Sequence, residues 1–136
     1  MSERREFTFT SRIESVEEAA QEAEKFARHS GLGDEYIFAI DMAVRESVAN
    51  AVKHGNRFDE SKTVNVVFEA DEAAFRMLVR DFGTGFDVGH VEDPTDPANL
   101  LKANGRGILF MNTFMDEVEW IRPEGGGTAV KMLKKL

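Results

Sequence analysis

The sequence contains no cysteine among its 136 residues. Disulfide frameworks, thiolate nucleophiles and cysteine metal clusters are therefore excluded, and a chain without disulfides suits a reducing compartment. Long hydrophobic runs are also missing. The first residues, MSERREFTFT, lack the apolar stretch of a signal peptide, and no segment approaches the length of a membrane span. We therefore expect a cytoplasmic protein with no membrane partner.

Basic residues are in deficit: 17 lysines and arginines stand against 25 aspartates and glutamates, which gives a formal net charge of −8. A negatively charged surface is repelled by phosphate backbones, so we expect no direct contact with nucleic acid. Hydrophobic residues make up 42% of the chain and charged residues 31%, which is typical of a globular protein. The length suits a single domain over residues 1–136.

Two helices are expected in the first half of the chain, after a short strand at residues 6–10. Apolar residues recur at helical spacing over 15–31 and again over 34–55. Ser15 opens a capping-box pattern, and Asp34 is of a residue type that caps helices, so each helix has a predicted start. A glycine ends each run.

The second half of the chain reads as two hairpins separated by a loop and a short helix. The predicted strands are 63–70, 73–81, 116–122 and 128–133. Between the hairpins, residues 82–104 have little periodicity, which is typical of a functional lid, and a helix is predicted at 108–115. This order predicts an α+β two-layer sandwich, with a mostly antiparallel mixed sheet covered on one face by helices.

Glu46, Asn50 and His54 follow one another at intervals of four residues in the second predicted helix. This spacing places all three along one side of the helix, turned away from the apolar positions Val44 and Val48. A solvated polar face explains such a pattern as well as a functional site does. Taken alone, the three residues leave both interpretations open.

Asp81 falls in the same alternating row as apolar residues of its strand that should face the helices. A carboxylate in that row needs a hydrogen-bonding partner. In one interpretation the strand ends one residue early and Asp81 is an ordinary turn residue. In the other, Asp81 accepts a hydrogen bond from the amino group of a planar ligand, and Gly83 and Gly85 let the backbone approach the ring.

Gly105, Arg106 and Gly107 precede the helix predicted at 108–115. Backbone N–H groups at such a position bind phosphate, and Arg106 would add a planar cationic fork. A plain turn is the alternative explanation. The chain has no Walker A lysine motif, and its glycines do not follow the dinucleotide pattern, so phosphate-loop and Rossmann sites are excluded.

The ordered combination of these motifs resembles the nucleotide site of the GHKL ATPases, the class that includes gyrase, heat-shock chaperone, histidine-kinase and mismatch-repair ATPase domains. The motifs are Glu46-x-x-x-Asn50, Asp81-x-Gly83-x-Gly85, Gly105-x-Gly107 and Gly127-Thr128. Within this class, the small size and the run from Asn50 to Asn56 most resemble the anti-sigma-factor serine kinases. No helical hairpin with a phosphoacceptor histidine precedes the motifs, which argues against a histidine kinase.

The resemblance implies a Bergerat-type fold with an ATP lid at about residues 86–104. It implies that Asn50 supplies an oxygen ligand to Mg²⁺ on the ATP phosphates and that Glu46 is the general base. Asp81 would receive the adenine amino group with the support of Thr128. The other implied nucleotide-binding residues are Lys53, His54, Gly83, Gly85, Gly105, Arg106 and Gly107. For Lys53 a solvated charge at the helix end, and for His54 a capping or packing role, are the alternatives.

By resemblance, the chain would be a Mg-ATP-dependent serine protein kinase that works as a homodimer. It would hold a sigma factor inactive and phosphorylate a small anti-anti-sigma antagonist of the STAS type. The alternative is a regulatory module in which ATP is only a structural ligand and partners are exchanged without phosphate transfer. Such a module would keep Asn50 and Asp81 but would make Glu46 incidental.

Overall fold

The computed structural model describes residues 2–83 and 111–136. The elements, in chain order, are β1 (Glu3–Thr10), α1 (Glu14–His29), α2 (Asp34–Asn50), the π-helix η1 (Ala51–Gly55), β2 (Thr63–Ala70), β3 (Ala74–Arg80), β4 (Glu117–Ile121) and β5 (Ala129–Lys135). Residues 111–114 are also helical. None of the helices in the described ranges is long and apolar enough to cross a bilayer.

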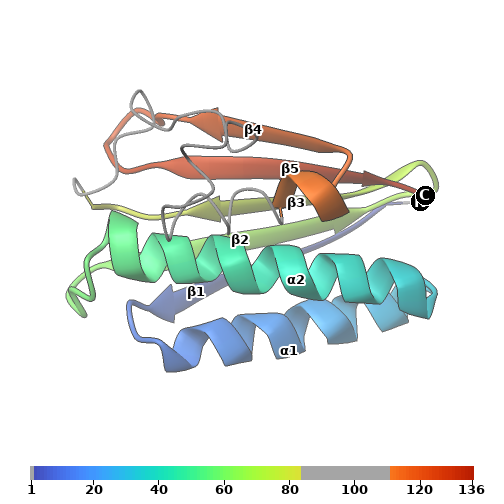
Figure 1. The fold of residues 1–136 in the computed structure, drawn as a ribbon, viewed down its shortest axis with the longest axis horizontal. Helices are drawn as coiled ribbons and strands as arrows, with labels where there is room; N and C mark the ends of the chain where they lie inside the picture. Colours follow the sequence, from blue (N-terminus) through green and yellow to red (C-terminus); the bar gives the residue numbers. More distant parts are fainter. Residues whose placement is uncertain (1, 84–110) are drawn as a thin grey trace.

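The strands form one sheet in the order β1-β2-β3-β5-β4, and every pair of neighbours is antiparallel. Helices α1 and α2 lie side by side across one face of this sheet (Figure 1). The α+β sandwich predicted from the element order is therefore confirmed. Both predicted hairpins are present, β2 with β3 and β4 with β5, and β3 pairs with β5 to join them.

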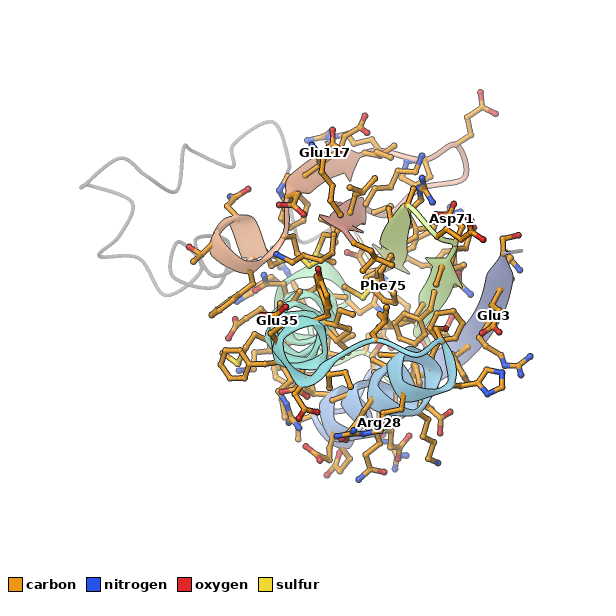
Figure 2. The ribbon with its side chains drawn as sticks, turned by 90° about the vertical axis from the view of Figure 1, so that its right-hand side faces the viewer. Glu3, Arg28, Glu35, Asp71, Phe75 and Glu117 are labelled. Atoms are coloured by element: carbon orange, nitrogen blue, oxygen red, sulfur yellow. The ribbon has the colours of Figure 1, made fainter. Side chains whose placement is uncertain are left out.

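The core lies between the helices and the inward face of the sheet. Phe68 of β2 and Phe75 of β3 are fully buried, with ring centroids 6.0 Å apart, and Phe26 of α1 packs 5.8 Å from Phe68. Figure 2 shows Phe75 between the sheet and the two helices. The period-two alternation of β2 and β3 thus placed its apolar residues on the correct face.

The starts of both helices differ from the predicted caps. Helix α1 begins after Ile13, and no side chain caps it, because the Ser15 hydroxyl donates instead to the Thr10 carbonyl at 2.6 Å. Helix α2 begins after Gly33, also without a side-chain cap. The Ser15 hydroxyl therefore ties the end of β1 to α1, a use that the capping-box pattern could not distinguish.

The end of α2 widens into the π-helix η1, whose five residues replace the last predicted α-helical turn. The Asn56 N–H donates to the Ala51 carbonyl at 2.8 Å, five residues back. Two residues with positive φ follow, Arg57 at 52° and Phe58 at 59°. Such wide turns and left-handed residues often occur at functional sites. Gly55, the last residue of η1, lies against Asp81 at the end of β3, where the candidate site is found.

Candidate functional site

Asp81 follows the last residue of β3 and is buried, with 4% of its surface exposed. Its Oδ1 atom accepts hydrogen bonds from the N–H groups of Gly83 at 3.0 Å and Thr128 at 3.2 Å. The Asp81 N–H in turn donates to the Thr128 carbonyl at 2.9 Å. The strand does end one residue early, but Asp81 still continues the buried row. Oδ1 receives both N–H groups, and Oδ2 lies against Gly55.

Three glycines let the backbone pack closely around Asp81. A Cβ atom on Gly55 would overlap the Asp81 carboxylate, and one on Gly127 would overlap the Asp81 carbonyl oxygen. A Cβ atom on Gly83 would overlap the Gly55 carbonyl oxygen. The end of η1, the segment after β3 and the segment before β5 are therefore held together at distances that only glycine allows.

A small pocket opens beside Asp81, between the end of α2 and the sheet. Its lining residues are Ser47, Asn50, Ala51, Val79, Asp81, Trp120, Thr128 and Val130. Asn50 is buried, and within the described part of the chain its Nδ2 atom has no hydrogen-bond partner. A buried amide without a partner is unfavourable unless a ligand uses it. Three of the predicted site residues, Asn50, Asp81 and Thr128, thus meet in one pocket.

The Asp81 carboxylate in this pocket has a shifted pKa. Burial raises the pKa of Asp81 above its ordinary value, and the N–H groups of Gly83 and Thr128 oppose this rise by stabilising the ionised form. The folded protein therefore carries a carboxylate that is poorly solvated. Within the described residues, the backbone N–H groups of Gly83 and Thr128 are the hydrogen-bond donors to this carboxylate.

The other predicted residues of α2 and η1 lie outside the lining of this pocket. Glu46 is partly exposed one turn before Asn50, and no hydrogen bond reaches it from residues 2–83 or 111–136. Lys53 is exposed and His54 partly exposed in η1. Arg45, beside Glu46, is bound by Glu17 of α1 and by Asp41, and the Glu17 hydrogen bond is the largest cause that raises the pKa of Arg45.

Asn56 supports the site in a way that the sequence motifs did not reveal. Its Nδ2 atom donates to the Ser11 hydroxyl at 2.6 Å and to the Thr63 carbonyl at 2.9 Å. Its Oδ1 atom accepts the Phe82 N–H at 2.9 Å. Asn56 therefore fixes the backbone next to Asp81. The available sequence signal was an asparagine directly after the glycine that ends the helix. The groups that Asn56 bonds to are distant in the sequence, so this signal could not identify them.

Several predicted residues lie outside the described part of the chain. They are Gly85, Gly105, Arg106 and Gly107, together with the lid predicted at about 86–104. Their proposed phosphate contacts remain predictions.

The donor set fits a magnesium nucleotide better than a protein-only metal site. In the described ranges, no three histidine, aspartate or glutamate side chains come together as metal ligands. Magnesium is often bound through few protein oxygens together with phosphate oxygens and water. The buried Asn50 amide, whose nitrogen lacks a partner in this part of the chain, can offer its Oδ1 atom to such an ion.

The α+β sandwich carries a pocket shared by a helix asparagine and a buried aspartate, and comparison with known proteins identifies the family. The model of the histidine kinase-like ATPase domain matches residues 9–134, so the chain belongs to this family. The chain is 34% identical over 106 residues to the anti-sigma F factor of Clostridium perfringens (strain SM101 / Type A), covering 75% of this chain and 74% of that protein. It is equally similar to the anti-sigma F factor of Bacillus thuringiensis (strain Al Hakam), of which 71% is covered.

Proposed function

We propose that this chain is a Mg-ATP-dependent serine protein kinase that acts as an anti-sigma factor. The observation that carries the proposal is the pocket shared by Asn50 and Asp81, with Glu46 one turn before Asn50 on the same helix. Membership of the histidine kinase-like ATPase family supports ATP as the nucleotide. The whole of residues 1–136 would form the one catalytic domain.

In the proposed complex, the adenine amino group donates to Asp81 and Thr128 supports this contact. Asn50 would hold Mg²⁺ through its Oδ1 atom, and the ion would supply charge neutralisation of the phosphates. Lys53, His54 and Arg106 are proposed to contact the phosphates. Gly83, Gly85, Gly105 and Gly107 are proposed to give the nucleotide close access to the backbone.

The proposed chemistry is transfer of the γ-phosphoryl group to a serine hydroxyl of a partner protein. The bond between the serine oxygen and the γ-phosphorus forms, the bond from that phosphorus to the bridging oxygen of ADP breaks, and the serine proton goes to Glu46. A general base must have a free oxygen for that proton. Glu46 accepts no hydrogen bond within the described ranges, which supports this role.

The proposed partners follow from the names of the relatives, which are anti-sigma F factors. We propose that the chain binds a sigma factor and phosphorylates an anti-anti-sigma antagonist of the STAS type, whose phosphorylation state decides which partner is held. The protein would act as a homodimer in the cytoplasm. With 25 acidic against 17 basic residues, it would contact neither nucleic acid nor membrane directly.

The test is transfer of labelled γ-phosphate to a purified STAS-type antagonist. The wild-type protein should phosphorylate the antagonist, and Glu46→Gln should lower the rate by at least about 100-fold, the usual contribution of a general base. Binding of Mg-ATP, measured in the same samples, should be nearly unchanged. Glu35→Gln, a substitution at an exposed residue of the same helix, is the matched control and should transfer phosphate normally.

A regulatory module that binds ATP without transferring phosphate is the competing function. The position of Glu46 outside the pocket lining favours it. In that case the antagonist would gain no phosphate with the wild-type protein, although Mg-ATP binds. Unchanged antagonist mass under saturating Mg-ATP would therefore reject the kinase and leave the ATP site intact.

A further inference from the structure

The predicted adenine contact depends on two chain segments that meet at Asp81. One segment is residues 81–83, and the other is Gly127 and Thr128, directly before β5. They are joined by the Asp81 N–H to Thr128 carbonyl bond at 2.9 Å and by the Thr128 N–H to Asp81 Oδ1 bond at 3.2 Å. The direction of the Asp81 carboxylate therefore depends on where the second segment lies.

The turn that leads into β5 has little stiffness of its own. Gly125, Gly126 and Gly127 have φ values of +92°, +98° and +82°. Glycine samples both signs of φ, so three in succession leave many backbone conformations available. Within the turn, Gly126 N–H donates to the Pro123 carbonyl at 3.3 Å, which is long for a bond of this type.

Arg80, the last residue of β3, ties this turn to the sheet. Its Nη2 atom donates to the Glu124 carbonyl at 3.2 Å and to the Gly126 carbonyl at 3.1 Å. Its guanidinium carbon also lies 4.5 Å from the centre of the Phe82 ring. One side chain therefore contacts both the glycine turn and the segment that follows Asp81.

Arg80 acts from the face of the sheet opposite to the pocket. Side chains alternate along β3, and Val79 and Asp81 belong to the buried, helix-facing row that lines the pocket. Arg80 does not line the pocket. It lies on the other face of the sheet from the carboxylate proposed to bind adenine, so its effect on adenine binding would pass through Asp81 and Thr128.

We infer that Arg80 is a positioning residue for adenine recognition, which holds the glycine turn so that the Thr128 N–H and the Asp81 carboxylate keep their bonded geometry. The inference rests on the proposed ATP site. The planar guanidinium suits this task because it donates to two carbonyls and stacks on an aromatic ring at once. A lysine at this position could keep the positive charge and one hydrogen bond, but it has no planar group to stack on the Phe82 ring.

The test compares the binding of Mg-ATP with that of Mg-purine riboside triphosphate, which lacks only the 6-amino group. The wild-type protein should prefer ATP by about tenfold or more, the value of one hydrogen bond to a carboxylate. Arg80→Ala should reduce this preference to within about threefold, and Arg80→Lys should fall between. Arg76→Ala removes an arginine from the same strand, where Arg76 pairs with Asp71 away from the turn, and should keep the wild-type preference.

Hydrogen exchange gives a second measurement that needs no nucleotide. Arg80→Ala and Arg80→Lys should both speed exchange of the Thr128 N–H relative to amides in the middle of β3, because the turn opens more often. If Arg80 only stabilised the fold, its replacement would weaken the binding of both nucleotides equally, or would speed the exchange of all amides alike. Either result would overturn the inference. If the wild-type protein does not prefer ATP over purine riboside triphosphate, the proposed adenine contact itself is wrong. If the wild type prefers ATP and Arg80→Ala keeps that preference, only the role of Arg80 is wrong.

Discussion

Gly55 and Asp81 are packed so closely that the absence of a side chain on Gly55 sets the position of the Asp81 carboxylate. A Cβ atom on Gly55 would overlap both the Oδ2 and Cγ atoms of Asp81. The π-helix η1 ends at Gly55, so its wider turn delivers this glycine to the end of β3. The helix that carries Asn50 and the strand that leads to Asp81 are thereby locked into one site.

Gly55→Ser should therefore destabilise the protein by about 1–3 kcal/mol, the usual cost of overpacking a filled site, and should lower ATP affinity. Urea unfolding and nucleotide titration measure the two effects. Gly33→Ser is the matched control, because Gly33 has φ −76° and no heavy atom within 4 Å of an added Cβ. A stable Gly55→Ser protein that binds ATP normally would contradict the close packing.

Asn56→Ala should be among the more destabilising substitutions near the site. It would remove the partner of the buried Ser11 hydroxyl and of the part-buried Thr63 carbonyl and Phe82 N–H. A buried polar group left without its partner costs roughly 1–3 kcal/mol. Asn65→Ala, which removes more exposed hydrogen bonds from β2, should cost less than about 1 kcal/mol. Equal midpoints of urea unfolding for the two variants would show that Asn56 does not brace the site.

The stability of the nucleotide-free protein should depend on pH through Asp81. Because burial raises the folded-state pKa above the ordinary value of 3.8, the folded protein holds this proton more tightly than the unfolded chain. Asp81 therefore favours folding below its ordinary pKa, and that contribution is lost as the pH rises through the raised value. Near neutrality, the ionised carboxylate opposes folding.

Asp81→Asn should accordingly be more stable than the wild type at neutral pH, with the difference shrinking as the pH falls. Urea unfolding of both proteins between about pH 4 and about pH 7 measures this difference. The hydrogen bonds from Gly83 and Thr128 can persist, since an amide oxygen also accepts them. A variant that is less stable than the wild type across the whole range would show that Asp81 supports the fold rather than a ligand.

Asn50 should matter for Mg-ATP but not for folding. Its Nδ2 atom has no partner within the described residues, so Asn50→Leu should leave the melting temperature of the nucleotide-free protein unchanged or higher. The same variant should bind Mg-ATP at least about tenfold more weakly. With Mg²⁺ removed by a chelator, the wild type and the variant should bind ATP alike. An affinity difference that persists in chelator would exclude the magnesium role.

The fold was predictable because its signals are local. The alternation of Val64, Val66 and Phe68 assigned the inward face of β2, and the helical spacing located α1 and α2. The predicted caps were wrong because the Ser15 hydroxyl bonds to the Thr10 carbonyl, and because Gly33 rather than Asp34 is the N-cap of α2. The family model over residues 9–134 agrees with the resemblance drawn from the motifs.

The site was predictable only in part. The motif positions of Asn50, Asp81 and Thr128 meet in one pocket, as their order in the chain indicated. The bracing by Asn56 and Arg80 was not foreseen, because each acts through backbone groups that are distant in sequence. Glu46, Lys53 and His54 share the helical run but not the pocket lining. The nucleotide-binding roles of all these residues, Asn50, Asp81 and Thr128 included, remain proposals.

The central claim is that the pocket beside Asp81 recognises ATP, and a thermal shift on adding Mg-ATP tests it most directly. At about 100 times the dissociation constant, bound nucleotide should stabilise the wild-type protein by about 2.7 kcal/mol and raise its melting temperature by several degrees. At the same nucleotide concentration, Asp81→Asn should gain about half of that stabilisation or less, because its affinity should fall about tenfold or more. Asp34→Asn, at a side chain that is 94% exposed, should shift like the wild type. Equal shifts in the wild type and Asp81→Asn would contradict the proposed ATP site.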